Sequence, residues 1–189
     1  MNIYYRMVKH RGSRKGKKRC VRRTRRNRRI RGGDDPEKPV KVFENPTQVS
    51  DLVTAIRTID KQEVENILKE NSNTAKGVEY NGSLYLPLVY AVIKADTVNS
   101  DPKRKKDIME IIEKLINAGA HPNIGNMYDT PLFLAITSGN RELVNFLIEK
   151  SREKSQNLVL DDQSKNYIKS LPEEYEYTQF LKTRFKDMF

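Results

Sequence analysis

Residues 114–150 read K-L-I-N-A-G-A-H-P-N-I-G-N-M-Y-D-T-P-L-F-L-A-I-T-S-G-N-R-E-L-V-N-F-L-I-E-K, and this stretch decides the fold. Apolar residues recur with helical spacing in residues 132–136 and again in 143–148, and the turn pair Gly139-Asn140 separates the two segments. Thr130 is a good N-cap for the first segment, and Pro131 lies in its first turn, where a missing N–H costs nothing. The pattern therefore predicts a helix, a tight turn and a second helix.

A further helix is expected just before these two. The apolar residues Ile111, Ile112, Leu115 and Ile116 have helical spacing, and Gly119 follows them. A glycine at that place can adopt the left-handed conformation that closes many helices. The chain is therefore expected to leave one helix at Gly119 and to turn toward the next.

Two short motifs resemble those of the ankyrin-repeat family. Residues 130–135, T-P-L-F-L-A, are close to the ankyrin signature T-P-L-H-x-A. Residues 118–123, A-G-A-H-P-N, look like the hairpin that links one ankyrin repeat to the next. The resemblance implies an all-α fold: a short ankyrin-repeat solenoid, in which helix-turn-helix repeats stack side by side with β-hairpin-like tips between them.

About three repeats are expected between residues 46 and 151, the smallest number at which stacking buries a continuous core. We expect them at residues 46–79, 80–123 and 124–151. When Ala55 is aligned with Ala135, the apolar residues of the first repeat match those of the third without a gap, and Ile59 takes the place of the turn glycine, Gly139.

The second repeat departs from the family period. Its motif begins at Pro87, which stands 44 residues before Pro131, whereas ankyrin repeats recur every 33 residues. Residues 96–106 supply the excess. Because they are polar, we expect this insertion to form a loop between the two helices of the repeat.

The C-terminal residues 152–189 are expected to form a helical cap over the last repeat, with helices at 162–171 and 173–188 on either side of Pro172. A sharper alternative lies in the same segment. Leu171-Pro172-Glu173-Glu174-Tyr175 resembles the L-P-x-E opening of the truncated F-box found at the end of poxvirus-type ankyrin proteins. That resemblance implies a ubiquitin-ligase substrate adaptor.

Positive charge is concentrated at the N-terminus. Residues 1–33 hold 15 of the 36 Lys and Arg residues and no Asp or Glu, so residues 34–189 hold 21 basic and 25 acidic residues. Residues 1–45 are therefore expected to form a disordered basic arm and linker. Residues 11–33 could bind DNA or RNA phosphates in a salt-sensitive way, or could be a nuclear or nucleolar localisation signal. The cations proposed for either contact are Lys17, Lys18, Arg19, Arg22, Arg23, Arg25, Arg26, Arg28 and Arg29.

Catalysis has little support in the sequence. The two histidines, His10 and His121, fall in the arm and in a hairpin, and with the single cysteine, Cys20, they fit no common zinc spacing. No Gly-rich loop follows a strand, so no cofactor is expected. A lone cysteine suits an intracellular setting, with the nucleus or nucleolus favoured by the arm and the cytoplasm left open. The longest nearly apolar run, residues 84–93, is too short to cross a membrane, and no signal peptide is expected.

Protein binding is the function that the motifs favour. Ankyrin arrays present their hairpin tips and first helices to partners, and aromatic or Met side chains at tips are typical interface anchors. An alternative for each tyrosine is that it packs on a neighbouring repeat. The residues expected at tips are Tyr80, Tyr85, Met127 and Tyr128, and those expected on the first helices are Arg57, Ile93, Lys94, Thr137 and Ser138.

The sequence thus predicts a non-enzymatic protein–protein interaction scaffold, monomeric outside its complexes, with a basic arm for nuclear targeting or non-specific nucleic-acid binding. The alternatives are the ligase adaptor and a protein that primarily binds nucleic acid. An Arg-rich arm beside a short, irregular array also resembles proteins of large nucleocytoplasmic DNA viruses, such as the mimivirus group. Nothing in the sequence identifies the protein partner.

Overall fold

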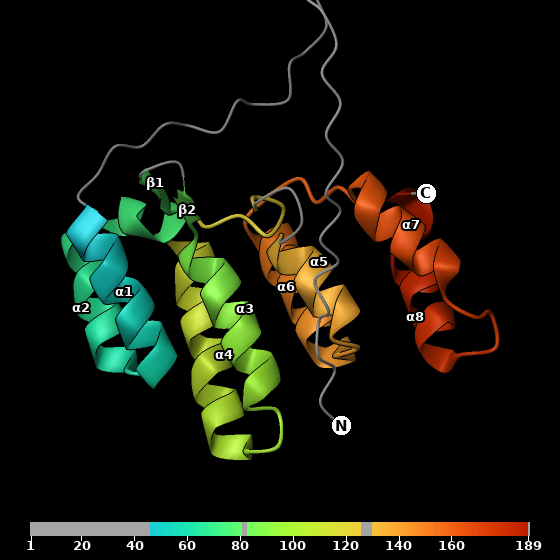
Figure 1. The fold of residues 1–189 in the computed structure, drawn as a ribbon, viewed down its shortest axis with the longest axis horizontal. Helices are drawn as coiled ribbons and strands as arrows, with labels where there is room; N and C mark the ends of the chain where they lie inside the picture. The colour runs from blue at the N-terminus through green and yellow to red at the C-terminus, as the bar shows by residue number, and fades with distance from the viewer. Residues whose placement is uncertain (1–45, 81–82, 126–129, 189) are drawn as a thin grey trace, which may run out of the picture. The chain divides into compact units, whose positions relative to one another are not determined.

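The computed structural model describes residues 46–80, 83–125 and 130–188 of the 189-residue chain. The chain divides into two units at Pro36, and every described residue belongs to the second, Glu37–Phe189. This described part is mostly helical, as Figure 1 shows, which confirms the expected all-α class. The predictions for the basic arm and linker, residues 1–45, lie outside the described residues.

The elements of the described residues are eight α-helices, two short 3₁₀ helices and one two-stranded hairpin. In chain order they are α1 (Pro46–Thr58), α2 (Lys61–Glu70), η1 (Ser72–Lys76), β1 (Val78–Tyr80), β2 (Ser83–Tyr85), α3 (Pro87–Thr97), α4 (Pro102–Asn117), α5 (Pro131–Thr137), α6 (Arg141–Glu153), α7 (Asp162–Ser170), α8 (Glu176–Arg184) and η2 (Lys186–Met188).

The helices form four pairs that follow one another within the second unit (Figure 1). Helix α1 packs on α2, α3 on α4, α5 on α6 and α7 on α8. Successive odd-numbered helices also contact one another, from α1 through α3 and α5 to α7, and α4 contacts both α2 and α6. We call α1, α3, α5 and α7 the first layer, and α2, α4, α6 and α8 the second layer.

Side-chain caps explain where several helices begin. The Thr130 side chain accepts the backbone N–H of Phe133 at 3.2 Å, and Pro131 follows as the first residue of α5, as predicted. Asp60 caps α2 through the N–H of Glu63. Each such cap satisfies an N–H group that the helix itself leaves without a partner, which stabilises the fold by about 1 kcal/mol.

Left-handed residues explain where helices end. Gly119 has φ of +99° just after α4, and Gly139 has φ of +73° just after α5, as expected for glycines that close helices. Ile59 has φ of +61° after α1, the place where the alignment puts it opposite Gly139. The backbone thus makes the same turn at both places, although only one of them has a glycine.

The expected loop at residues 96–106 is wrong. Helix α3 continues to Thr97, and α4 begins at Pro102, so only residues 98–101 connect them. The reason is local: the Asp101 carboxylate accepts the N–H groups of Lys103 and Arg104, and Pro102 suits the first helical position. The insertion therefore extends both helices.

The C-terminal residues fold against the third helix pair, but their helices are shorter than expected. Helix α7 ends at Ser170, and α8 runs only from Glu176 to Arg184, so the expected helix at 173–188 is wrong at both ends. Residues 171–175 instead form the connection between α7 and α8. Leu181 and Phe185 are nevertheless buried, with exposed fractions of 0% and 1%.

One hydrophobic core runs through the described helices, from Leu52 in α1 to Phe185 after α8. Its largest fully buried side chains come from every pair: Phe185, Leu52, Ile56, Ile108, Ile111, Ile112, Leu115, Ile116, Leu132, Ile136, Leu143 and Leu147. Because each helix covers apolar residues of its neighbours, the pairs depend on one another for stability.

Candidate functional site

The C-terminal halves of α1, α3 and α5 place the five residues predicted for the first helices at corresponding positions. Alanines at matching places, Ala55, Ala91 and Ala135, are buried and allow these helices to pack closely. Two to three residues later, the side chains of Arg57 and Ser138 are exposed, Ile93 is 46% exposed, and Lys94 and Thr137 are partly exposed. We call Arg57, Ile93, Lys94, Thr137 and Ser138 the first-layer face.

Aromatic contacts join neighbouring helices of the first layer. The Arg57 guanidinium of α1 lies 5.2 Å from the centroid of the Tyr90 ring of α3. The rings of Phe133 in α5 and Tyr167 in α7 meet edge to face, with centroids 6.1 Å apart. Contacts of this kind orient side chains that are half exposed. The contact with Tyr90 orients the Arg57 side chain on the surface.

Thr137 is less available than its sequence position suggested. Its hydroxyl donates within hydrogen-bonding distance to the carbonyl oxygens of both Phe133 and Leu134, at 3.1 Å each. The Ser138 hydroxyl likewise donates to the Ala135 carbonyl at 2.9 Å. The face of α5 is therefore small and largely satisfied by its own backbone, whereas α3 presents an exposed isoleucine and a lysine.

The β1–β2 hairpin lies before α3 and brings Tyr85 to the surface. Val78 pairs with Tyr85 across the two antiparallel strands, and the Tyr85 side chain is 37% exposed. A hollow of about 340 Å³ beside it is lined by Pro46, Thr47, Ser50, Val78 and Tyr85. The backbone of Tyr80 lies in β1, but its side chain, like Met127 and Tyr128, lies outside the described residues.

Gly77 makes the hairpin possible. Its φ of +84° is a conformation that other residues rarely adopt, and a Cβ placed there would lie 2.3 Å from the Tyr85 carbonyl oxygen. Only glycine therefore lets the chain pass so close to β2.

His121 has a turn role, as the sequence suggested. Its Nδ1 accepts the backbone N–H of Asn123 at 3.1 Å, and the Pro122 carbonyl accepts the N–H of Leu132 at 3.0 Å. The second contact ties the turn to the start of α5. This histidine thus helps to position the connection between the second and third helix pairs.

Ion pairs join the second layer, and the sequence analysis missed them. Lys61 of α2 lies 2.6 Å from Asp107 and 2.9 Å from Glu110, both in α4, and Lys114 of α4 pairs with Glu65 of α2. The same arrangement recurs between α4 and α6 and between α6 and α8. The further pairs are Lys105–Glu142 at 2.6 Å, Lys150–Glu113 at 2.9 Å, Arg184–Glu149 at 3.0 Å and Arg141–Glu176 at 3.3 Å.

These pairs change the proton affinity of their members. Hydrogen bonds from Lys114 and then Lys69 lower the pKa of Glu65 to about 2. The bond to Asp107, followed by the bond to Glu110, raises the pKa of Lys61. Because all of these side chains are at least partly exposed, the pairs fix the register of the helices more than they stabilise the fold.

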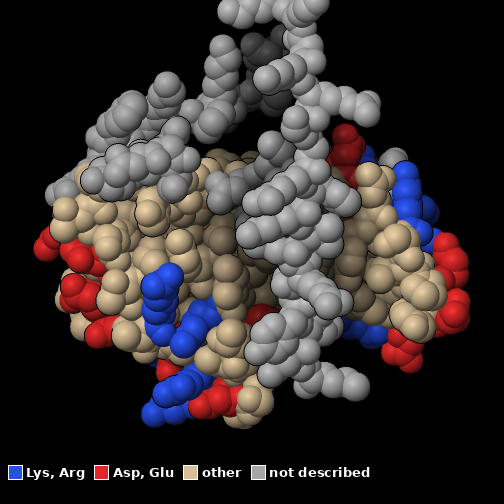
Figure 2. Space-filling view, viewed as in Figure 1, with Lys and Arg blue, Asp and Glu red and all other residues tan. Residues whose placement is uncertain are grey.

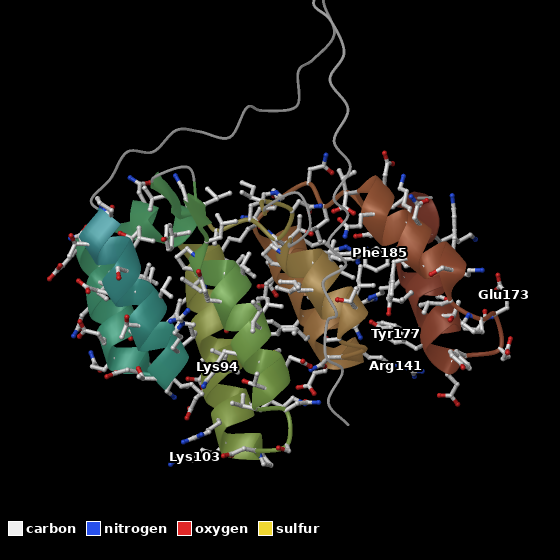
Figure 3. All side chains as sticks on the ribbon, in the orientation of Figure 1. Lys94, Lys103, Arg141, Glu173, Tyr177 and Phe185 are labelled. Carbon is white, nitrogen blue, oxygen red and sulfur yellow. The ribbon has the colours of Figure 1, made fainter. Side chains whose placement is uncertain are left out.

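A groove of about 630 Å³ runs between α6 and the C-terminal helix α8. Arg141 stands at its edge, 5.7 Å from the centroid of the Phe180 ring and paired with Glu176. Beside it, the Tyr177 hydroxyl donates to the Ile136 carbonyl at 2.7 Å, and burial raises the pKa of this phenol above its ordinary value. Figure 3 shows Arg141 and Tyr177 on the side of α8 that faces α5 and α6. The contacts attach the C-terminal helices to the rest of the unit.

The segment that resembles an F-box opening serves the α7–α8 connection. Leu171 packs on the core, and the Glu173 carboxylate pairs with Lys182. The Glu173 carbonyl accepts the side-chain amide of Gln179 at 2.7 Å. Pro172 and Glu174 are exposed. The ligase-adaptor hypothesis stays a prediction.

Two findings on chemistry concern the described residues only. No group of three or more His, Cys, Asp or Glu side chains among them is arranged to hold a metal ion. None of the helices in the ranges 46–80, 83–125 and 130–188 has the length and apolar character needed to span a membrane. The arm cations from Lys17 to Arg29 lie outside these ranges.

Comparison with known proteins found no match to a protein-family model, to a curated protein or to a solved structure.

Proposed function

We propose that this chain is a non-enzymatic protein-binding module of the ankyrin-repeat type, with the first-layer face and the β1–β2 hairpin as its binding surface. In this proposal three helix pairs within residues 46–151 are the repeats, and α7 and α8 are a cap. The basic arm serves nuclear targeting or non-specific nucleic-acid contact.

The observation that carries the proposal is that three successive first-layer helices each bring an exposed side chain to the surface shortly after a buried alanine. Arg57, Ile93 and Ser138 follow the buried alanines of α1, α3 and α5 by two to three residues, and each is exposed. Helices that pack side by side have axes about 8–10 Å apart, so these three helices offer a surface roughly 20 Å across. That is wide enough for a peptide or the edge of a small domain.

The character of the surface supports a protein partner. Ile93 is an exposed aliphatic side chain in the middle helix, and Tyr85 adds an exposed ring at the hairpin that precedes the same helix. An apolar centre with polar neighbours is typical of protein interfaces. Arg57, already held against Tyr90, loses little further freedom on binding.

The turns and the ion pairs support the repeat interpretation. Ile59 and Gly139 share a left-handed conformation at aligned positions, and corresponding helices of successive pairs are joined by similar lysine–carboxylate bridges. A solenoid requires such equivalence, because every repeat packs against its neighbour through the same pair of surfaces.

The test is affinity purification of the full-length chain from cells that produce it, with nuclease added to remove nucleic acid. Three proteins are compared: the natural chain, the double substitution Ile93→Arg and Ser138→Arg on the first-layer face, and a control, Gln62→Arg and Asn66→Arg on the exposed side of α2. The proposal is supported by a protein that still co-purifies with the natural chain and with the control after nuclease treatment. The same protein should not co-purify with the first-layer variant. Identical sets of proteins with both variants would contradict it.

A further inference from the structure

Four cations lie together where α3 ends and α4 begins. Lys94 comes from the last turn of α3, and Lys103, Arg104 and Lys106 come from the first turns of α4. Figure 3 shows Lys94 and Lys103 at the same end of this helix pair, and Figure 2 shows blue side chains gathered there, with red acidic side chains beside them. We call Lys94, Lys103, Arg104 and Lys106 the α3–α4 basic patch.

The patch is not neutralised by the fold. Among the described residues, no carboxylate lies within ion-pair distance of Lys94, Lys103 or Lys106, and Arg104 reaches only Asp101, at 3.8 Å. Lys105 in the same run behaves differently, since it lies 2.6 Å from Glu142 of α6. Lys105 therefore pairs with the neighbouring helix, whereas Lys94, Lys103 and Lys106 form no ion pair with a described carboxylate and can attract anions.

The acidic residues near the patch offset only part of its charge. Asp101 is engaged as the N-cap of α4, because its carboxylate accepts the N–H groups of Lys103 and Arg104. Asp96 is exposed on α3. Asp107 lies one residue beyond the run and is paired with Lys61 at 2.6 Å; the hydrogen bond from Lys61 lowers its pKa, and the charges of Lys103 and Lys106 add to this effect. Residues 94–106 contain five Lys and Arg residues and two acidic residues, Asp96 and Asp101, so the segment has a net positive charge.

Helix stability does not explain the cations at the start of α4. The N-terminal end of a helix carries a partial positive charge, so a lysine or arginine in the first turn is unfavourable relative to a neutral residue. Asp101 and Pro102 are enough to start α4. Lys103 and Arg104, in the first turn of α4, are therefore unfavourable for the free protein, and a bound polyanion would reverse that effect.

We infer that the α3–α4 basic patch binds the phosphodiester backbone of nucleic acid. Lysines are point charges on flexible stems, which suits contact with successive phosphates and gives no preference for sequence. No aromatic side chain in the described residues 94–106 could stack on a base. An import receptor that takes an extended basic peptide would have to unwind α4, because residues 103–106 are helical.

The α3–α4 basic patch shares Lys94 with the first-layer face, but it includes neither Ile93 nor Ser138 and no residue of the arm. Arm and patch are joined in one chain, so binding by either raises the local concentration of nucleic acid at the other. The result expected is tighter, more salt-sensitive binding than the arm alone would provide. Failure of the protein-binding proposal would leave this inference unaffected, since its test uses nucleic acid alone.

The test measures how binding of a 20-base-pair mixed-sequence DNA duplex to the full-length chain depends on salt. The patch variant is Lys94→Gln, Lys103→Gln and Lys106→Gln. The control, Lys154→Gln, Lys165→Gln and Lys169→Gln, removes the same charge from lysines that have no ion pair with a described residue.

The slope of log K against log salt concentration is negative, and each lost phosphate contact reduces its magnitude by about 0.9. The patch variant should therefore lose between about 2 and 3 units of slope, and the control less than about 1.

Hydrogen exchange provides an independent readout on the natural chain. Binding of the duplex should slow amide exchange in residues 94–106 more than in residues 154–169. Equal loss of slope in the two variants, or no loss in either, would overturn the inference. So would a patch variant that binds DNA as the natural chain does but loses an acidic protein partner, because the patch would then be a protein-binding surface.

Discussion

Ile59 and Gly139 adopt the same left-handed backbone conformation, with φ of +61° and +73°, although one is β-branched and the other has no side chain. Each also donates its N–H to an isoleucine three residues earlier, Ile59 to Ile56 at 3.1 Å and Gly139 to Ile136 at 3.2 Å. The equivalence of the two turns is the clearest local sign that the first and third helix pairs are built alike. It also identifies a strained residue in the first pair.

Replacing Ile59 with glycine should be close to neutral. The left-handed conformation costs a β-branched residue about 1–2 kcal/mol, and glycine avoids that cost. The substitution also removes a side chain that is partly packed on the core. We expect the free energy of unfolding, measured by urea denaturation, to change by less than about 1 kcal/mol. As a control, Ile56→Gly in the same helix should cost more than about 3 kcal/mol. A loss above about 2 kcal/mol at Ile59 would show that packing outweighs strain.

The two glycines at Gly77 and Gly139 should differ in their tolerance of alanine. At Gly139 a Cβ would meet no atom within 4 Å, so Gly139→Ala carries only the backbone cost of about 1–2 kcal/mol. At Gly77 the Cβ would also collide with the Tyr85 carbonyl, and we expect a loss of about 3 kcal/mol or more. Chemical denaturation of the two variants measures both costs. Equal losses would mean that the hairpin adjusts to the extra atom.

Local signals account for what the sequence could predict. Thr130, Gly119 and Gly139 act on their own neighbours along the chain, and each does what its residue type predicts. Start and stop signals also explain the error at residues 96–106. Asp101-Pro102 is a helix start, but hydrophobic spacing does not reveal it, because the residues around it are polar.

Contacts between distant residues could not be predicted in this way. Lys114 pairs with Glu65 at a separation of 49 residues, and the Tyr177 hydroxyl reaches Ile136 across 41 residues. Neither partner has a feature that reveals the other, because the contact depends on how the helix pairs pack. The position of each candidate surface residue in its helix could be predicted because it depends on local sequence, whereas its exposure could not, because exposure depends on neighbouring helices.

Acid should remove the contribution of the Glu65–Lys114 pair. The pKa of Glu65 is lowered from 4.5 to about 2, so the pair stabilises the fold above about pH 4.5 and loses that effect as the pH falls toward 2. The difference in Tm between the natural chain and Glu65→Gln should be positive at pH 6 and should shrink over this interval. Glu70→Gln, an exposed residue of the same helix with no ion pair to a described cation, is the control. A difference that does not depend on pH would contradict the assignment.

The C-terminal helices should be required for stability. Phe185 is only 1% exposed and lies in the same core as α1 to α6, so Phe185→Ala should cost about 3–5 kcal/mol. Tyr175→Ala, at a ring that is 56% exposed, should change the free energy of unfolding by less than about 0.5 kcal/mol. Thermal or urea denaturation distinguishes the two. A small effect at Phe185 would mean that α7 and α8 are an appendage and that the first three pairs are stable without them.

Deleting residues 11–33 separates the roles of the two units. The core of the described residues lies wholly within the second unit, so the truncated chain should keep its helical circular dichroism and its urea midpoint. The deletion removes 13 of the 15 cations of residues 1–33, and most of the salt dependence of DNA binding should disappear with them. Some salt dependence should remain, because Lys94, Lys103 and Lys106 can still make about three phosphate contacts.

Loss of helical signal would contradict the division into an arm and a folded unit. A slope of zero would contradict the basic patch, and an unchanged slope would show that the arm contributes nothing to nucleic-acid binding and leave nuclear targeting as its use.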